Sequence, residues 1–233
     1  MRSLARVVLV HSPLVGPSSW RRVAALLRAR GWGGVVPTLS HVFDDAPPFG
    51  SRLAAAVAAA GHGEEPVVLV AHSGAGPILP QAAALVTAPV RGAIYVDAQL
   101  PRPGLSWLDT APAELVDHLR ELATGDRLPP WNEWFPPHAI RELLPDPRTR
   151  TEFCAELPAV PFSYFEEPAS PRHVAVPGRA YYLRLSDAYA AEADAATDAG
   201  WPVVREAAHH LAILTDPELI AATLDPMIRE LVT

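Results

Sequence analysis

Residues 67–79 read Val-Val-Leu-Val-Ala-His-Ser-Gly-Ala-Gly-Pro-Ile-Leu, and this stretch decides the fold. It consists of an apolar β-forming run, a serine among small residues, and an apolar run typical of a helix. The order strand, sharp turn, helix is typical of a nucleophile elbow, a strained turn that exposes the hydroxyl of its central serine, here Ser73. The flanking positions hold Ala71 and Ala75 where this motif usually has glycines. A polar turn residue between an ordinary buried strand and a helix is the alternative interpretation.

Length and composition predict one large soluble α/β domain. The chain has 233 residues, of which 49% are hydrophobic and 19% charged, enough to bury a sizeable core. The net charge is −7, and all 19 basic residues are arginines scattered along the chain. This pattern predicts a small-molecule substrate, with neither nucleic acid nor a membrane as partner, and leaves the oligomeric state open.

Targeting and metal-binding signals are also missing from the sequence. The apolar run at Val7–Val10 is too short for a secretory signal, and we expect a cytoplasmic protein without a transmembrane span. The single cysteine, Cys154, excludes an intrachain disulfide and a cysteine-based zinc site. The histidines show no metal-ligand spacing, so we predict no metal site and no cofactor.

Strand-like and helix-like segments alternate on both sides of a different central region. The outer segments fit buried parallel strands, each followed by a helix, which predicts a mostly parallel, doubly wound sheet. The expected strands are 7–10, 35–39, 67–70, 93–96, 181–185 and 203–205. The expected helices are 20–30, 52–60, 78–86, a helix ending near 199, and 217–231.

The central region, residues 101–177, has a different composition. It holds 14 of the 26 prolines and three of the six tryptophans, and amphipathic pieces such as 113–122 and 138–144 alternate with proline pairs. Linkers lack this aromatic content, so we expect an inserted helical cap. The core of the single domain would then consist of residues 1–100 and 178–233.

Each candidate catalytic residue follows an expected strand at its C-terminal end, where α/β sheets place their sites. In chain order these residues are Ser73, Asp97, Asp187 and the pair His209-His210. A serine hydroxyl needs a histidine to take its proton, and the histidine needs a carboxylate to fix its tautomer. The order Ser, Asp, His therefore predicts a catalytic triad.

These residues give the chain a resemblance to the α/β-hydrolase superfamily over nearly its full length. It is most similar to the branch of hydroxynitrile lyases and plant methylesterases, through His11, Trp20, Ser73, a proline-bearing loop ending at Pro101, and His210. The resemblance implies an α/β-hydrolase fold with a cap and without the earliest strands of longer members. It also implies that His210, which precedes Leu-Ala-Ile-Leu, is the base, and that His209 lines the entrance.

Two aspartates remain candidates for the triad acid. Most superfamily members carry the acid after the strand that here ends at Leu185, which nominates Asp187. Asp97 follows the earlier strand in a context that resembles the haloalkane dehalogenases, and we prefer it. Each has a plain structural alternative: Asp187 as a helix-start residue and Asp97 as a loop cap.

The resemblance also identifies an unusual oxyanion loop. In relatives one backbone N–H comes from the residue after the nucleophile, here Gly74, and a second comes from the position that holds Pro13. Proline has no N–H, so we expect Ser12 or Leu14 to substitute, or the second donor to be missing. Hydroxynitrile lyases carry a hydroxyl residue at the position of Ser12.

We therefore predict a serine hydrolase for a small, largely apolar ester, thioester or lactone. One alternative is a lyase or cyclase that uses Ser73 and His210 as acid–base groups without an acyl-enzyme. A non-catalytic binder of small molecules is a further alternative.

Overall fold

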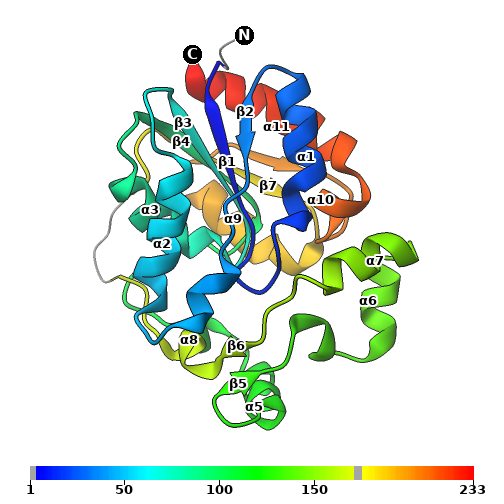
Figure 1. Ribbon diagram of the computed structural model, residues 1–233. Coiled ribbons are helices and arrows are strands. Elements are labelled where there is room, and N and C mark those ends of the chain that lie inside the picture. Colours follow the sequence, from blue (N-terminus) through cyan, green and yellow to red (C-terminus); the bar gives the residue numbers. More distant parts are fainter. Residues whose placement is uncertain (1–3, 171–174) are drawn as a thin grey trace.

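The computed structural model describes residues 4–170 and 175–233, and its centre is one parallel sheet (Figure 1). The strands lie in the order β2-β1-β3-β4-β7-β8, and each pairs with its neighbours in parallel. This confirms the predicted parallel α/β sheet. The strands are β1 (Arg6–Val10), β2 (Gly33–Val35), β3 (Val67–Ser73), β4 (Val90–Ala98), β7 (Arg179–Arg184) and β8 (Val203–Arg205).

Both faces of the sheet are buried because apolar side chains alternate between two cores. In β1, Val7 and Leu9 belong to one core and Val8 and Val10 to the other, and all four are fully buried. The first core is completed by α1 (Ser18–Ala29), α10 (Ala212–Thr215) and α11 (Pro217–Val232). The second is completed by α2 (Phe49–Ala60), α3 (Leu79–Leu85) and α9 (Ala190–Asp198).

One predicted strand is wrong in its position. The sequence predicts a strand over residues 35–39, whereas β2 is Gly33–Val35. Gly33 and Gly34 did not suggest a strand, because glycine is depleted in strands. Gly34 is nevertheless required there: a Cβ on it would lie 2.9 Å from the carbonyl oxygen of Ala24 in α1.

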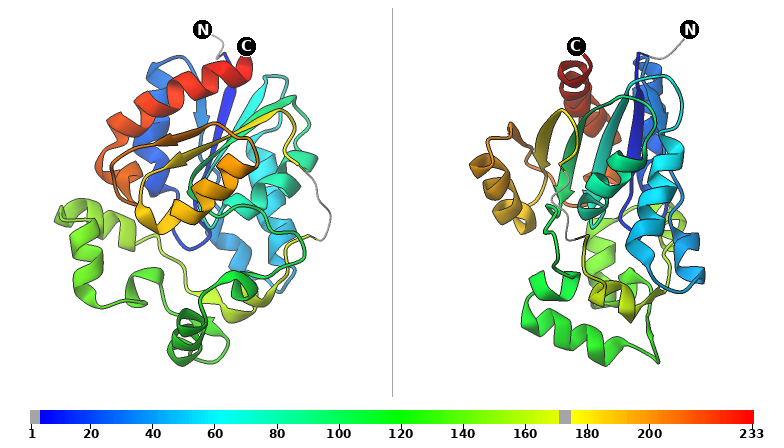
Figure 2. Two further views of the ribbon diagram at one scale, coloured as in Figure 1. Left: turned by 180° about the vertical axis from the view of Figure 1, so that it is seen from behind. Right: turned by 90° about the vertical axis from the view of Figure 1, so that its left-hand side faces the viewer.

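The segment between β4 and β7 folds beyond the C-terminal ends of the strands (Figures 1 and 2). The predicted helix at 113–122 is α5 (Ala113–Leu122), and the one at 138–144 is α6 (Pro137–Leu143). The cap boundaries at 101 and 177 stay a prediction, and residues 171–174 lie outside the described part of the chain. The other elements are α4 (Trp107–Thr110), β5 (Arg127–Leu128), η3 (Trp131–Glu133), α7 (Pro147–Cys154), β6 (Val160–Pro161) and α8 (Phe162–Glu166).

Two carboxylates of this segment hold it against the core. Glu156 accepts a hydrogen bond of 2.7 Å from the amide of Ser18, the first residue of α1. Glu167 accepts bonds of 2.6 and 2.8 Å from the amides of Phe49 and Gly50 at the start of α2. The first amides of a helix have no partner within it and favour negative charge, so both carboxylates stabilise the contact.

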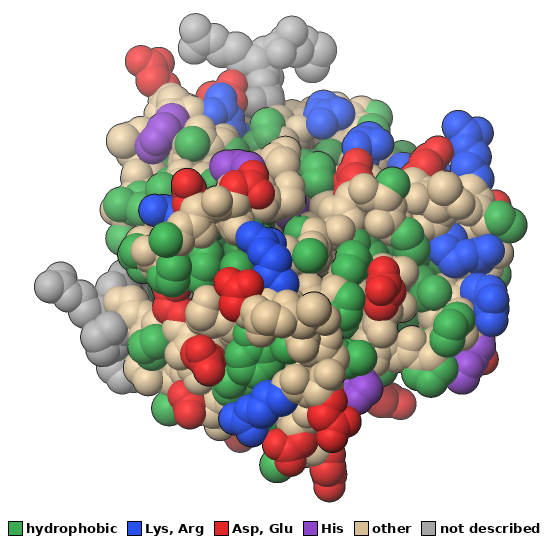
Figure 3. Space-filling view, turned by 60° about the horizontal axis from the view of Figure 1, so that its bottom comes forward, with side chains coloured by type: hydrophobic (Ala, Val, Ile, Leu, Met, Phe, Trp, Pro, Cys, Tyr) green, Lys and Arg blue, Asp and Glu red, His purple; other side chains and the backbone are tan. Residues whose placement is uncertain are grey.

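Seen from the cap end, the surface carries mixed charges (Figure 3). Among the described residues on this face, arginine side chains are interspersed with acidic and hydrophobic ones.

Candidate active site

Ser73 stands at the end of β3 in a strained turn. Its φ angle is +58°, a left-handed conformation that residues with a side chain rarely adopt. Ala71 and Ala75 beside it are fully buried. Gly76 begins the following turn, η2 (Gly76–Ile78), and a Cβ there would lie 1.8 Å from the carbonyl oxygen of Gln99. The small residues in the motif thus permit a close approach of the elbow to the end of β4.

Asp97 is brought to the site by a β-bulge. In the pairing of β3 with β4, His72 lies opposite Val96 and Ser73 opposite Ala98, so Asp97 is the extra residue. Its φ angle is +42°. A bulge bends a strand and re-aims the side chain of the inserted residue. Ser73 and Asp97 are the only non-glycine residues with positive φ in the described part of the chain.

His210 lies between these two residues, in the loop that follows β8. Its Nδ1 is 3.0 Å from Oδ2 of Asp97, and its Nε2 is 3.1 Å from Oγ of Ser73. With the ring hydrogen on Nδ1 and donated to the carboxylate, Nε2 is free to accept the hydroxyl hydrogen of Ser73. This is the arrangement in which a histidine acts as a general base on a serine.

The carboxylate of Asp97 is fully buried and accepts three further hydrogen bonds. The amides of Leu185 and Ser186 donate to Oδ1 over 2.8 and 3.1 Å, and the hydroxyl of Ser186 donates to Oδ2 over 2.6 Å. Burial alone would raise the pKa of Asp97, but the hydrogen bonds from His210, Ser186 and Leu185 hold that pKa below its ordinary value. Asp97 is therefore ionised at neutral pH.

Asp187 and His209, the alternative acid and base, lie outside this chain of hydrogen bonds. The side chain of Asp187 is 97% exposed, and its carboxylate pairs with Arg184 over 2.9 Å. His209 accepts a bond from the amide of Leu211 on Nδ1, and its Nε2 lies 2.9 Å from the hydroxyl of Thr215. His209 is thus engaged in the turn that leads into α10, and burial lowers its pKa.

Two residues that were not predicted from the sequence contact His210. The ring of His72 stacks on His210 with 4.4 Å between centroids, and its Nε2 donates to the carbonyl of His210 over 2.9 Å. Burial, followed by the charge of His210, lowers the pKa of His72 to about 3, so its ring is neutral. Its position beside the nucleophile was the signal that could have found it.

Tyr189 is the second of these residues. It ends the turn η4 (Asp187–Tyr189) after β7, and its ring stacks on His210 at 5° with 4.9 Å between centroids. Its hydroxyl oxygen is 3.2 Å from Oγ of Ser73. In this turn the sequence nominated Asp187 for its carboxylate, and no motif singled out the tyrosine two residues beyond it.

Of the two residues expected to replace the missing donor at Pro13, Ser12 and Leu14, the second has its amide engaged. The N–H of Leu14 donates to Oγ of Ser12 over 3.3 Å, so Leu14 is not free to bind a substrate oxygen. Ser12 packs against the elbow, since a Cβ on Gly74 would lie 3.3 Å from its Oγ. Within the described residues, no acceptor takes the hydroxyl hydrogen of Ser12. The hydroxyl of Ser12 is therefore available as a donor beside Gly74.

A cavity of about 600 Å³ begins at Gly74, although neither Ser73 nor His210 lines it. Arg102 is the only arginine among its described lining residues, and it pairs with Glu192 over 2.9 Å. Glu192 also accepts a bond from the amide of Leu100. The walls come from α2, α3 and the segment after β4, and they include Leu53, Ile78, Leu100, Leu105 and Trp107.

Metal-binding groups and membrane spans were also sought among the described residues. No group of three or more histidine, cysteine or acidic side chains among residues 4–170 and 175–233 is placed to hold a metal ion. In the same part of the chain, every helix is too short or too polar to cross a bilayer.

Comparison with known proteins identifies the family and supports the fold. The profile of the alpha/beta hydrolase family matches residues 7–223. An extracellular alpha/beta-hydrolase from a Paenibacillus species is 17% identical, with a TM-score of 0.71 over 94% of this chain and 97% of that one. A pyrethroid hydrolase from Sphingobium faniae is 20% identical, with a TM-score of 0.71 over 95% of this chain and 96% of that one.

A third structure extends the range of activities among similar folds. Tomato methylketone synthase I, as a variant in complex with β-ketoheptanoate, is 14% identical, with a TM-score of 0.70 over 97% of this chain and 98% of that one. No protein with a curated function matches. These identities establish the fold alone. The Paenibacillus protein is described as extracellular, so the cytoplasmic location of this chain stays a prediction.

Proposed function

The chain belongs to the alpha/beta hydrolase family, and we propose that it is a serine hydrolase with Ser73, His210 and Asp97 as its catalytic triad. The observation that carries this proposal is the continuous chain of contacts from Oδ2 of Asp97 through His210 to Oγ of Ser73, over 3.0 and 3.1 Å. The positive φ of Ser73, at the turn that follows β3, supports its role as the nucleophile.

In the proposed reaction, Nε2 of His210 removes the hydroxyl proton of Ser73 while Oγ attacks the carbonyl carbon of the substrate. Asp97 stays ionised and stabilises the imidazolium that forms. The tetrahedral intermediate collapses as its bond to the leaving group breaks, and His210 passes its proton to that leaving group. Water then repeats the sequence on the acyl-enzyme and releases the acid.

The oxyanion would be held by two different kinds of donor. Gly74 supplies its backbone N–H, as the residue after the nucleophile does in this fold. Ser12 supplies its hydroxyl, because Pro13 has no N–H and the amide of Leu14 is engaged. A hydroxyl rotates to follow its acceptor, so it can serve an oxyanion that moves between the two chemical steps.

The cavity beside Gly74 supports a small, largely apolar ester, thioester or lactone as the substrate. Its lining includes aliphatic and aromatic side chains, and the charge of Arg102 is neutralised by Glu192. A substrate with a free carboxylate would find no unpaired arginine among the described lining residues. The proposed chemistry needs no cofactor, since the triad supplies nucleophile, base and acid.

A lyase or cyclase reaction is the second candidate. The observation that favours it is the oxyanion loop, which offers a serine hydroxyl where ordinary hydrolases offer an amide. In that case Ser73 and His210 would move a proton on the substrate without forming an acyl-enzyme.

A panel of p-nitrophenyl esters with short acyl chains tests the proposal, together with labelling by a fluorophosphonate. We expect turnover of these esters and one adduct on intact-mass analysis that is lost in Ser73→Ala. Adduct formation without ester turnover would favour the lyase or cyclase. The absence of both would favour a non-catalytic binder and contradict the proposal.

Variants of the loop after β1 test the oxyanion assignment separately. Losing one oxyanion donor lowers kcat by about 100- to 1,000-fold, and we expect Ser12→Ala to lower ester turnover in this way. Pro13→Ala restores an amide and is expected to preserve turnover or to increase it. Wild-type activity in Ser12→Ala would mean that this hydroxyl takes no part in oxyanion binding.

A further inference from the structure

Two hydroxyl groups lie at the turn that carries Ser73. Ser12 packs against Gly74, on the side of the proposed oxyanion donors. Tyr189 lies with His210: its ring is parallel to the imidazole, and its hydroxyl is 3.2 Å from Oγ of Ser73. The proposed mechanism uses Ser12 and leaves Tyr189 without a role.

The direction of the hydrogen bond between Tyr189 and Ser73 follows from the triad. Ser73 has one hydrogen, which points to Nε2 of His210 when the serine is ready to react. Its Oγ therefore accepts the hydrogen of Tyr189. Burial raises the pKa of Tyr189 to about 12, so the phenol is protonated throughout the neutral range. In the described part of the chain, Ser73 is the hydroxyl's only hydrogen-bond partner.

The hydroxyl of Tyr189 loses Oγ of Ser73 as its acceptor when the reaction proceeds. Oγ becomes part of an ester when Ser73 is acylated, and an ester oxygen is a much weaker acceptor than a hydroxyl. The leaving-group oxygen on the same carbon gains charge, and it must lie within reach of Nε2 of His210 to be protonated. The parallel stacking keeps the phenol beside that same imidazole.

We propose that Tyr189 is a further catalytic residue, whose hydroxyl donates a hydrogen bond to the leaving-group oxygen as the acyl–oxygen bond breaks. The inference rests on the proposed serine hydrolase function. The electron pair of the broken bond goes to the leaving oxygen, and the proton on that oxygen comes from Nε2 of His210. Tyr189 keeps its own proton. In deacylation it donates to the oxygen of the attacking water in the same position.

The hydrogen bond becomes more valuable as the leaving oxygen becomes more basic. An ester of an aliphatic alcohol releases a strongly basic alkoxide oxygen, so its cleavage depends most on this hydrogen bond. The p-nitrophenolate ion is a stable leaving group without it. A merely structural defect has a different signature, because a lost or misfolded fraction of enzyme slows all esters by the same factor.

The test is Tyr189→Phe, which removes the hydroxyl and keeps the ring that stacks on His210. We expect kcat/KM for acetate esters of aliphatic alcohols to fall by about 10- to 100-fold, and that for p-nitrophenyl acetate by less than about 3-fold. A plot of log kcat/KM against leaving-group pKa becomes steeper. An unchanged slope would overturn the inference.

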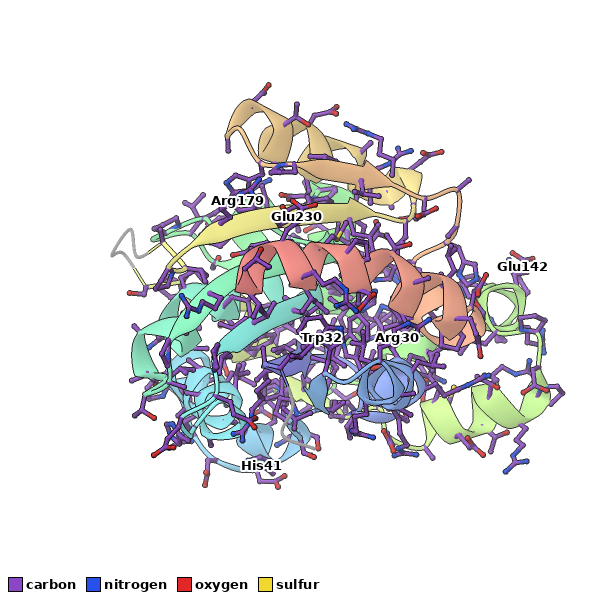
Figure 4. All side chains as sticks on the ribbon, turned by 90° about the horizontal axis from the view of Figure 1, so that it is seen from above. Arg30, Trp32, His41, Glu142, Arg179 and Glu230 are labelled. Carbon is purple, nitrogen blue, oxygen red and sulfur yellow. The ribbon has the colours of Figure 1, made fainter. Side chains whose placement is uncertain are left out.

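Tyr181→Phe is the matched control. Tyr181 lies on β7, the strand that leads to Tyr189, and its hydroxyl donates to Glu230 over 2.5 Å. Glu230 belongs to α11 and lies beside Arg179, the first residue of β7 (Figure 4). The same atom is deleted from the same type of residue, so we expect both the rates and the slope to match the wild type.

A second series separates this inference from the proposed function. Aryl phosphonates with phenols of graded acidity react once with Ser73, and intact mass reports the rate without any turnover of carboxylic esters. If wild-type Ser73 forms no adduct with any of them, the proposed function is overturned and the inference with it. If adducts form and Tyr189→Phe leaves the slope unchanged, the inference alone is overturned. A steeper slope in the variant supports it.

Discussion

Asp97 and Asp187 each follow a strand of the same parallel sheet, yet only one of them lies in the site. Asp97 is fully buried and accepts four hydrogen bonds, one of them from His210. Asp187 is 97% exposed and pairs with Arg184 three residues before it. The end of β4 therefore carries the carboxylate, and the residues after β7 supply three of the hydrogen bonds that it accepts.

The difference shows what makes a strand-end carboxylate able to serve a histidine. A buried charge is costly unless its lone pairs are satisfied, and the end of β7 satisfies them with the amides of Leu185 and Ser186 and the Ser186 hydroxyl. The bulge then turns Asp97 toward His210. Asp187 has neither of these supports, and it is held by a surface ion pair.

The largest expected effect contrasts the two aspartates directly. Asp97→Asn removes the charge that stabilises the imidazolium and favours the wrong tautomer, so we expect kcat/KM to fall by about 10,000-fold. Asp187→Asn leaves the hydrogen bonds of the site unchanged, and we expect activity within about 2-fold of wild type, because surface substitutions have small effects. Steady-state kinetics on p-nitrophenyl acetate measures both. A large loss in Asp187→Asn would refute the division of roles.

The second effect tests the support that β7 gives to Asp97. Ser186→Ala removes the hydroxyl that donates to Oδ2 over 2.6 Å. Hydrogen bonds to charged groups contribute about 1.5–3 kcal/mol, so we expect the free energy of unfolding to fall by about that amount. Activity is expected to fall by about 10-fold as the carboxylate becomes less well oriented, an effect of about 1.4 kcal/mol on the transition state.

Ser163→Ala is the control for this experiment. It removes a hydroxyl from another half-buried serine, located in α8 away from Asp97. Urea unfolding and ester kinetics of the two variants give the comparison. Equal behaviour of both would mean that the Ser186 hydroxyl adds nothing to the environment of Asp97.

Much of this contrast was accessible from the sequence. The apolar runs and their spacing predicted the parallel sheet, which is confirmed, and chain order placed Ser73, Asp97 and His210 at one edge of it. The preference for Asp97 over Asp187 rested on a resemblance, because the bulge between β3 and β4 that aims Asp97 at His210 has no local sequence pattern. The catalytic roles themselves stay a prediction.

The other omissions have the same origin. Tyr189 and Ser73 are in contact across 116 residues of sequence, through the turn η4 that follows β7. The loss of the Leu14 amide to Ser12 depends on the rotamer of one serine. Periodicity reports which face of an element is buried, but it does not report such side-chain contacts.

A smaller expected effect concerns the stability of the protein at low pH, and it contrasts a buried histidine, His72, with an exposed one. Burial and the charge of His210 lower the pKa of His72 to about 3 from 6.5, so protons bind preferentially to the unfolded chain between these values. Stability is therefore expected to fall as pH decreases through this window, and this histidine contributes about 1 kcal/mol of that loss between pH 7.5 and 5.5.

Urea unfolding at the two pH values measures this contribution. His72→Gln is expected to reduce the pH dependence by that amount, whatever its effect on stability at pH 7.5. His41→Gln replaces an exposed histidine at the periphery of the molecule (Figure 4) and serves as the control. An unaltered pH dependence in His72→Gln would contradict the buried, neutral state of this ring.

The smallest expected effect concerns the ion pair of Asp187. Exposed pairs contribute little because water and salt screen them, so Asp187→Asn should shift the melting temperature by about 2 °C or less. Differential scanning fluorimetry at low and high salt measures it. A larger, salt-dependent shift would show that the end of β7 relies on this pair.

The role of Asp97 as the triad acid is tested most directly by the rate at which a fluorophosphonate labels Ser73 in the wild type, Asp97→Asn and Asp187→Asn, followed by intact mass. The reaction reports the activation of the serine without any assumption about the natural substrate. We expect equal rates for the wild type and Asp187→Asn, and a rate at least about 100-fold lower for Asp97→Asn. Equal labelling of Asp97→Asn, or slow labelling of Asp187→Asn, would contradict this role of Asp97.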